Sequence, residues 1–253
     1  MIHPELHGSP VALDRLQDRG LRLRRDGDDN ARFATLNSMF IVVGEVGEAC
    51  KEYPVVWIEA GTDANGVRQV APIAVFGLAK GQNLCLEGGT WRTAYLPVLL
   101  RMYPFALARS GDVQYAICRD GRSSRLSLDD GEPLFEADGT PTALTLDIQR
   151  QLEQVEMEVE RTRLMGLELL RLDLLREMRF QATLPEGGSV GADGFLTIDE
   201  KRFAELPDAE LPKMHKSGLL RLVHGHQSSL SNMRRLAQWH VQRNGAAPAA
   251  ATP

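Results

Sequence analysis

The chain has 253 residues, of which 43% are hydrophobic and 25% are charged, and its 29 basic and 34 acidic residues give a formal net charge of −5. These proportions indicate a packed core, in one large domain or two small ones, and argue against a disordered chain. The negative balance argues against nucleic acid as a partner, because phosphate binding needs a concentrated basic field.

No stretch approaches the ~20 consecutive apolar residues of a membrane helix, so we expect no membrane insertion. The segment from Met1 to Pro10 lacks the apolar centre of a secretory signal. The three cysteines, Cys50, Cys85 and Cys118, have no Cys-x-x-Cys spacing, which favours neither a disulfide framework nor a zinc ribbon. We therefore predict a cytoplasmic protein, and export without an N-terminal signal stays open.

The hydrophobic pattern predicts an α+β fold with a curved, mostly antiparallel sheet in the N-terminal half. A long amphipathic helix, a β-hairpin and C-terminal helices follow it. We expect a flexible N-terminus over residues 1–19 and a single domain over residues 20–243. That domain is β-rich over 20–140 and helix-rich over 141–243. The Ala/Pro/Gly-rich tail, residues 244–253, is predicted to be disordered.

The β-rich part combines short strands with two short helices. The predicted strands are Leu21–Leu23, Val55–Ile58, Val70–Phe76, Asn83–Leu86, Phe105–Ala108 and Val113–Cys118. The second and third flank the turn-rich Gly61–Gly66 and are predicted to form a hairpin with a long loop. The predicted helices are Glu45–Glu52 and Tyr95–Tyr103. Each stops before a proline, because the residue ahead of proline is pushed out of the α region, and Pro97 fits the first turn of the second helix.

The helix-rich part opens with apolar residues that recur every three or four positions between Thr142 and Arg171. This spacing predicts one helical face, made of Ile148, Leu152, Val155, Val159, Thr162, Met165 and Leu169. We expect that face to pack on the sheet, and the same helix could also support a homodimer.

A second predicted hairpin pairs Met178–Leu184 with Gly194–Ile198 through a turn at residues 186–189. Asp199 is expected to cap a short helix that runs through Leu206. The further predicted helices are Leu211–His215 and Leu219–Gln242, the latter broken or bent near Gly225.

The sequence lacks the common catalytic signatures. It has no Gly-x-Ser-x-Gly elbow, no phosphate-binding loop ending in Gly-Lys-Ser/Thr and no His-Glu-x-x-His helix. The glycine-rich run at residues 187–191 joins two predicted strands and opens no helix, so it is interpreted as a turn rather than a dinucleotide site. Cys118 is interpreted as a core residue at a strand end, and Glu45, Glu48 and Glu52 as a solvated helix face. We predict no cofactor and favour a protein that is not an enzyme.

His224 and His226 provide the alternative, a metal-dependent oxygenase or hydrolase. A two-histidine site would also need a carboxylate such as Asp199 or Glu200. Histidines two positions apart diverge by about 200° on a helix. The competing interpretation is therefore that one histidine is buried and hydrogen-bonded while the other is solvated.

The best candidate for a binding surface surrounds the second short helix. Tryptophan, tyrosine and arginine are enriched in interface hot spots and aromatic-lined pockets. The candidate ligand- or partner-binding residues are Trp91, Tyr95, Arg101, Tyr103 and Phe105. We expect a protein or peptide partner, and a small molecule stays an alternative. The competing interpretation is that these aromatic residues anchor the helix to the sheet.

Many of the same segments carry a family likeness. They are Ile73–Leu78, Gly81–Leu84, Trp91, Tyr95–Pro97, Arg101–Phe105, Gly131, Leu134, Phe135, Gly194–Lys201, Ser217–Leu219, His224–His226, Ser229 and Leu230. Their order and spacing resemble the signature of the bacterial SapC family, from about Leu21 to Leu236. This family is distinct from the peptide-transporter permease of similar name, which spans the membrane.

The resemblance implies a role in a paracrystalline bacterial surface layer, for which the family is named. It also implies a link to the systems encoded beside family members, which include tryptophan-halogenase-like flavoproteins, cupin-type oxygenases and TonB-dependent receptors. It brings no catalytic residues with it. The preferred prediction is a non-enzymatic binding or accessory protein that holds a peptide, protein or small ligand.

Overall fold

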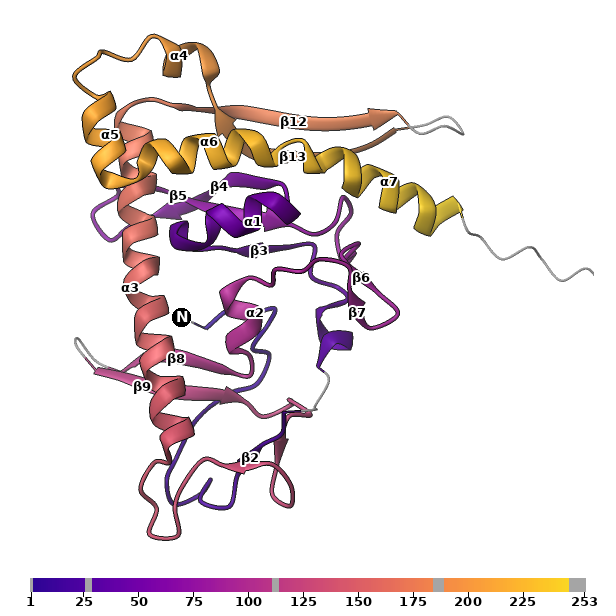
Figure 1. Ribbon diagram of the computed structural model, residues 1–253, viewed down its shortest axis with the longest axis vertical. Coiled ribbons are helices and arrows are strands. Elements are labelled where there is room, and N and C mark those ends of the chain that lie inside the picture. The colour runs from indigo at the N-terminus through magenta and orange to yellow at the C-terminus, as the bar shows by residue number, and fades with distance from the viewer. Residues whose placement is uncertain (1, 26–28, 111–113, 184–188, 246–253) are drawn as a thin grey trace, which may run out of the picture. The chain divides into compact units, whose positions relative to one another are not determined.

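The computed structural model describes residues 2–25, 29–110, 114–183 and 189–245 (Figure 1). With 38% helix, 26% strand and antiparallel sheets, it confirms the α+β fold. The chain forms two compact units. The first combines Met1–Phe33 with Val98–Glu160, and the second combines Ala34–Pro97 with Arg161–Pro253. The predicted single domain over residues 20–243 stays a prediction.

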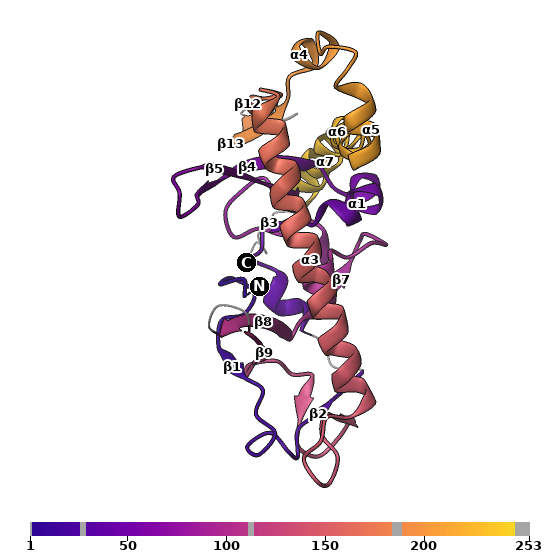
Figure 2. The same cartoon turned by 90° about the vertical axis from the view of Figure 1, so that its left-hand side faces the viewer.

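Two small antiparallel sheets build the first unit. One has the order β1-β9-β8, with β1 at Pro10–Ala12, β8 at Phe105–Ser110 and β9 at Gln114–Asp120 (Figure 2). The other has the order β10-β2-β11, with β2 at Arg22–Leu23, β10 at Leu126–Ser127 and β11 at Glu132–Pro133. The unit also contains the 3-10 helix η1, Asn30–Phe33, and the helix α2, Val98–Met102.

The N-terminal segment takes part in the first unit, although the sequence predicted that it lies outside the fold. Strand β1 pairs with the end of β9, and Leu6 and His7 are each only 3% exposed. Asp18 accepts a hydrogen bond of 2.6 Å from Arg119. A three-residue strand is too short to give a detectable alternation, so the pairing left little trace in the sequence pattern.

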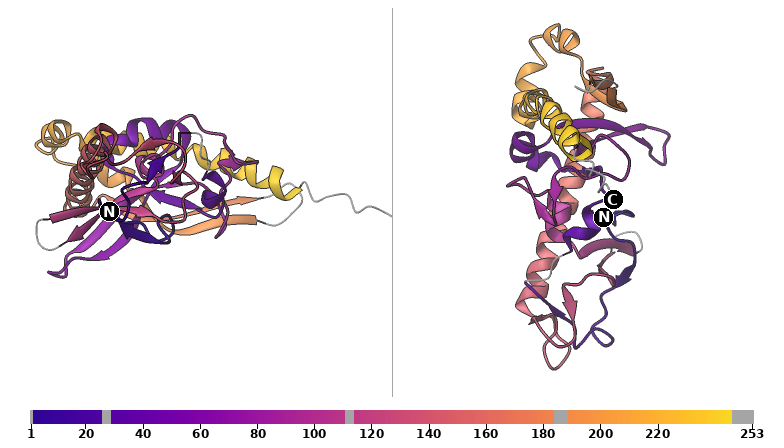
Figure 3. Two further views of the ribbon diagram at one scale, coloured as in Figure 1. Left: turned by 90° about the horizontal axis from the view of Figure 1, so that it is seen from below. Right: turned by 90° about the vertical axis from the view of Figure 1, so that its right-hand side faces the viewer.

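A five-stranded antiparallel sheet is the centre of the second unit. Its order is β12-β13-β4-β5-β3, with β3 at Ser38–Phe40, β4 at Val55–Thr62, β5 at Arg68–Val75, β12 at Leu175–Thr183 and β13 at Ser189–Ile198. Both predicted hairpins are present, and the second is a pair of long orange strands in the left panel of Figure 3. The predicted turn at residues 186–189 lies, except for Ser189, outside the described residues, as does the tail from residue 246 onward.

Short helices and one small hairpin complete the second unit. They are η2 (Val43–Glu45), α1 (Val46–Glu52), β6 (Leu86–Glu87), β7 (Thr90–Trp91), α4 (Glu200–Ala204), α5 (Leu211–Ser217), α6 (Leu219–Ser229) and α7 (Asn232–Gly245). The predicted cap of α4 is confirmed, since the Asp199 side chain accepts from the backbone N–H groups of Lys201 and Arg202. Among the described residues, no helix has the length and apolarity needed to cross a membrane.

The long helix α3, Ala143–Arg171, matches the sequence prediction almost to the residue. The predicted face is buried at Ile148, Leu152, Val155, Thr162, Met165 and Leu169. Gly166 lets the helix approach the sheet of the second unit, because a Cβ there would lie 2.8 Å from the carbonyl oxygen of Val70. The homodimer that this helix could support stays a prediction.

The second short helix is shorter than predicted, because α2 begins only at Val98. The carbonyl oxygen of Tyr95 accepts a hydrogen bond from the Tyr53 hydroxyl, which holds residue 95 in the loop ahead of the helix. Pro97 therefore precedes α2 rather than lying in its first turn. The predicted strand Asn83–Leu86 is also mostly a turn, in which the Asn83 side chain accepts from the N–H of Cys85 at 3.0 Å.

The C-terminal helix is broken, but not at Gly225. That glycine lies inside α6, where a Cβ would be 3.1 Å from a methyl group of Val46 in α1, so it serves close helix packing. The break falls between Ser229 and Asn232, where α6 ends and α7 begins. There the Ser229 hydroxyl accepts a hydrogen bond of 2.9 Å from the N–H of Val55, which fixes the end of α6 to β4.

Candidate functional site

The five predicted binding residues divide between the two units. Trp91 and Tyr95 belong to the second unit, whereas Arg101, Tyr103 and Phe105 belong to the first. Trp91 ends β7 and Tyr95 lies in the following loop, and both are half-buried. Arg101 is exposed on α2. The shared surface that the sequence predicted for these five residues stays a prediction.

Tyr103 and Phe105 were predicted to lie on a binding surface, but both are core residues. Their exposed fractions are 2% and 3%. The Tyr103 ring meets Phe33 edge-on at 5.4 Å, and its hydroxyl donates to Asp120 at 3.2 Å. Both residues lie where α2 is followed by β8, and their side chains pack in the core of the unit instead of reaching solvent. For these two residues the anchoring interpretation is correct.

Asp120 is the centre of a buried polar group in the first unit. Its carboxylate accepts hydrogen bonds from the Arg122 guanidinium at 3.0 and 3.2 Å and from the Gly8 N–H at 3.2 Å. Burial by itself would raise the pKa of Asp120, but the bonds from Arg122 and Tyr103 outweigh it and hold that pKa at about 2. This carboxylate thus joins the N-terminal segment to the end of β9 as a structural anion.

A cluster of two arginines and one tryptophan lies on the second unit. The guanidinium carbons of Arg92 and Arg235 are 5.1 and 5.3 Å from the centre of the Trp239 ring, a cation–π geometry. We call Arg92, Arg235 and Trp239 the arginine–tryptophan cluster. Arg92 directly follows Trp91 in the chain, so the cluster adjoins a predicted site residue.

Two acidic side chains hold the arginines of this cluster in place. Arg92 donates from Nε to Glu87 at 2.9 Å, while Arg235 donates to the backbone carbonyl of Glu52 and lies 3.7 Å from its carboxylate. The side chains of Arg92 and Arg235 keep 22% and 35% of their surface exposed. The cluster is thus charge-balanced, and part of its surface stays accessible.

An aromatic series leads from Trp91 into the core. Trp91 meets Phe76 edge-on at 5.6 Å, and Phe76 contacts Tyr53 at 5.2 Å. The Tyr53 hydroxyl shares a 2.7 Å hydrogen bond with Thr93, and burial raises the pKa of this tyrosine. Trp91 is therefore the outermost ring of a rigidly packed series.

The sequence prediction missed Arg235 and Trp239, because they are far from Trp91 in the chain. Both lie on α7, where Arg243 also donates to the carbonyl of Asn83 at 2.7 Å. A signal was available, since α7 carries an arginine and a tryptophan four positions apart. Such a pair lies on one side of a helix.

The two histidines of the metal alternative face different surroundings. His226 is fully buried, with Nδ1 2.8 Å from the carbonyl oxygen of Val55 and Nε2 2.9 Å from the Thr197 hydroxyl. His224 is exposed and packs edge-on against Phe203 at 5.7 Å. Both ring nitrogens of His226 are thus used within the protein. Within the described ranges, no three His, Cys, Asp or Glu side chains are grouped to hold a metal ion.

The cysteines are not arranged as nucleophiles. Cys85 is fully buried, and burial raises the pKa of its thiol to about 12 despite the nearby arginines Arg92 and Arg235. Cys118 is buried and Cys50 half-buried, and burial raises both of their pKa values. Thiolates are therefore scarce at neutral pH. One residue of the acidic row predicted as solvated, Glu45, is also buried, at 7% exposure.

Comparison with known families matches the chain to the SapC model over residues 13–236. Comparison with curated proteins and with solved structures gives no match. Several residues of the segments that carry the family likeness have structural roles here. Gly218 joins α5 to α6 at a φ of +86°, which favours glycine, and His226 and Ser229 fix α6 to β4. The chain belongs to the SapC family.

Proposed function

We propose that this SapC-family protein is a non-enzymatic accessory protein. It binds a protein or peptide at the face of its second unit that carries Trp91, Tyr95 and the arginine–tryptophan cluster. The observation that supports the proposal is the half-buried Trp239 ring with guanidinium groups 5.1 and 5.3 Å from its centre. Tryptophan and arginine dominate interface hot spots because they present a large, stiff contact area with a polar edge.

The ion pairs around the cluster favour association. Glu87 and Glu52 hold the two guanidinium groups before any partner arrives, so that binding freezes fewer side-chain rotamers. Trp91 is held in the same way by its edge-on contact with Phe76. A surface with its side chains fixed in advance is suited to a protein or peptide partner.

The geometry gives the metal-dependent alternative no support. Nδ1 of His226 faces a carbonyl oxygen, and Nε2 is within hydrogen-bonding distance of Thr197 and Ile198. A metal would have to displace buried hydrogen bonds that fix α6 to the sheet.

The experiment that tests the proposal compares partner capture by matched variants. Trp91→Ala and Arg92→Ala alter the proposed face, and Tyr115→Ala removes an aromatic side chain that is 49% exposed elsewhere. A captured protein is accepted as a partner only if both the wild type and Tyr115→Ala recover it. It must then also bind the wild type again as a purified protein. We expect each alteration of the face to weaken that rebinding at least tenfold, while the thermal transition shifts by only a few degrees.

A further inference from the structure

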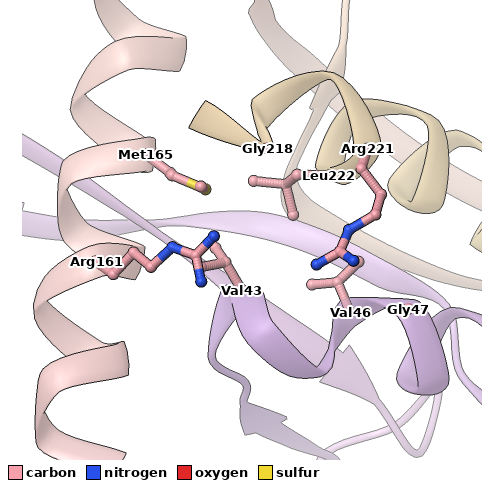
Figure 4. Close-up of a pocket in the computed structure, with 8 residues that line it drawn as sticks. All are labelled: Val43, Val46, Gly47, Arg161, Met165, Gly218, Arg221 and Leu222. Atoms are coloured by element: carbon pink, nitrogen blue, oxygen red, sulfur yellow. The ribbon is translucent and has the colours of Figure 1, made fainter. Parts of the chain in front are cut away.

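A small pocket lies on the second unit, apart from the arginine–tryptophan cluster. It is lined by Val43, Val46, Gly47, Arg161, Met165, Gly218, Arg221 and Leu222 (Figure 4). Helix α3, helix α6 and the η2–α1 segment form its walls. The cavity measures about 250 Å³ with its open mouth, and its enclosed part holds about one water-sized group.

Two guanidinium groups reach this pocket from different helices. Arg161 extends from α3 and Arg221 from α6, on opposite sides of the cavity (Figure 4). Both residues are exposed. The side chain of Arg221 has no hydrogen bond or ion pair with other residues of the described ranges. None of the described residues that line the cavity is acidic, so the pocket has the electrostatic character of an anion site.

The backbone shapes the pocket without setting its charge. Gly218 lies between the C-terminal end of α5 and the N-terminal end of α6, whose helix dipoles oppose each other there, so the positive character of the pocket comes from the two arginines. The η2 segment is held beside α3 by a 2.9 Å hydrogen bond from the N–H of Val43 to the Thr162 hydroxyl. A built-up Cβ at Gly218 would lie 3.5 Å from the Arg161 guanidinium, so that group lies directly over the glycine.

The remaining wall of the pocket is apolar. Val43 and Val46 lie on one side, and Met165 and Leu222 on the other (Figure 4). Burial of a hydrocarbon group against such a wall lowers the free energy of binding, whereas an inorganic anion has no apolar surface to bury there. The pocket therefore combines two guanidinium groups with an apolar surface suited to one or two methylene groups.

From this combination we propose that the pocket binds a single carboxylate attached to a short hydrocarbon chain. A small alkyl carboxylate and the side chain of a glutamate share this chemistry. The carboxylate accepts hydrogen bonds from the Arg161 and Arg221 guanidinium groups, and the methylene groups contact Val46 and Leu222. Because the enclosed space is small, the rest of the ligand extends through the mouth.

Propionate is the probe that tests this site. It is titrated at constant ionic strength against chloride while the thermal transition and the methyl NMR signal of Met165 are followed. We expect propionate to raise the transition by a few degrees and to shift the Met165 signal in a saturable manner. Propionamide, which lacks the charge, leaves both unchanged, and inorganic phosphate, which lacks the hydrocarbon, binds more weakly.

Variants assign the effect to the two arginines. Arg221→Gln and Arg161→Gln each weaken propionate binding at least tenfold. Arg234→Gln, a change at another exposed arginine of the same unit, leaves it as in the wild type. Equal responses to propionate and chloride, an unmoved Met165 signal, phosphate that binds more tightly than propionate, or full affinity in Arg221→Gln would overturn the proposal.

A blocked glutamate, acetylated and amidated so that only its side chain is anionic, separates the two sources of the carboxylate. Binding comparable to that of propionate assigns the pocket to an acidic side chain of a partner. Binding of propionate alone assigns it to a free carboxylic acid. These probes do not involve the proposed partner face at Trp91. The test of the pocket is therefore independent of the test of that face.

Discussion

The imidazole of His226 and the backbone of Val55 are joined by a 2.8 Å hydrogen bond from Nδ1 to the carbonyl oxygen, inside a fully buried contact between α6 and β4. This bond requires a proton on Nδ1. The Nε2 lone pair then accepts from the N–H of Ile198 at 3.2 Å. A second proton on Nε2 would face that N–H donor, so the native contact disfavours the charged ring.

Stability is therefore expected to fall in mild acid. Burial lowers the pKa of His226 from 6.5 to about 4, although the bond to Val55 partly opposes this. The unfolded chain takes up the proton below pH 6.5 and the folded chain only near pH 4. About 3 kcal/mol of unfolding free energy is thus present above pH 6.5 and lost as the pH falls to 4.

Denaturant unfolding at several pH values measures this effect. In His226→Asn the slope between pH 6.5 and 4 becomes much smaller, whereas the exposed change His224→Gln leaves it intact. A residual slope remains in His226→Asn, because burial also lowers the pKa of His7. An unchanged slope in that variant would show that His226 is not the titrating group.

Because α3 closely approaches the sheet of the second unit, we expect that a larger residue at Gly166 is not tolerated. In Gly166→Ala the new Cβ would lie 2.8 Å from a backbone oxygen and 3.1 Å from a methyl group of Val70, so the helix must shift. We expect a loss of about 1–3 kcal/mol in unfolding free energy. Gly47→Ala is the matched change in α1, where nothing lies within 4 Å of the Cβ, and it should leave stability equal or slightly higher. Equal effects of the two changes would contradict the packing described.

Much of the fold was predictable where the pattern is long and local. Helix α3 carries consistent apolar spacing over about six turns, from Ile148 to Leu169. In the β4–β5 hairpin, the Asp63 carboxylate accepts from the N–H groups of Asn65 and Val67, a typical turn contact. Strand β1 and helix α2 were harder to predict from the sequence, because β1 has only three residues and α2 only five. Tertiary contacts determine elements of that size.

The candidate site was only partly predictable for the same reason. The residue types that marked Trp91 as a binding residue occur at a half-buried side chain, but the same types at Tyr103 and Phe105 belong to the core. Composition cannot separate the two cases, because tyrosine and phenylalanine serve hot spots and cores alike. The Arg92–Trp239 contact joins distant segments, and no local pattern predicts it.

The burial of Phe105 predicts a large effect on stability. Phe105→Ala removes a side chain that is 3% exposed and should lower the unfolding free energy by about 3–5 kcal/mol. Arg101→Ala, four positions earlier on the exposed side of α2, should change it by about 0.5 kcal/mol or less. Thermal unfolding of both variants checks the contrast, and similar transitions would mean that Phe105 is not a core residue.

Thiol reactivity should follow burial. A neutral-pH disulfide reagent is expected to modify the half-buried Cys50 first, while Cys85, with its pKa raised to about 12, reacts only on unfolding. Mass spectrometry of the labelled peptides measures the order. Rapid labelling of Cys85 in the folded protein would mean that the loop ahead of β6 opens readily.

The most direct test of the accessory-protein proposal is the affinity of a purified partner for Trp91→Ala, compared with its affinity for Tyr115→Ala. The proposal predicts at least tenfold weaker binding for Trp91→Ala, with a folded protein, and wild-type binding for Tyr115→Ala. Wild-type affinity in a folded Trp91→Ala variant would contradict it.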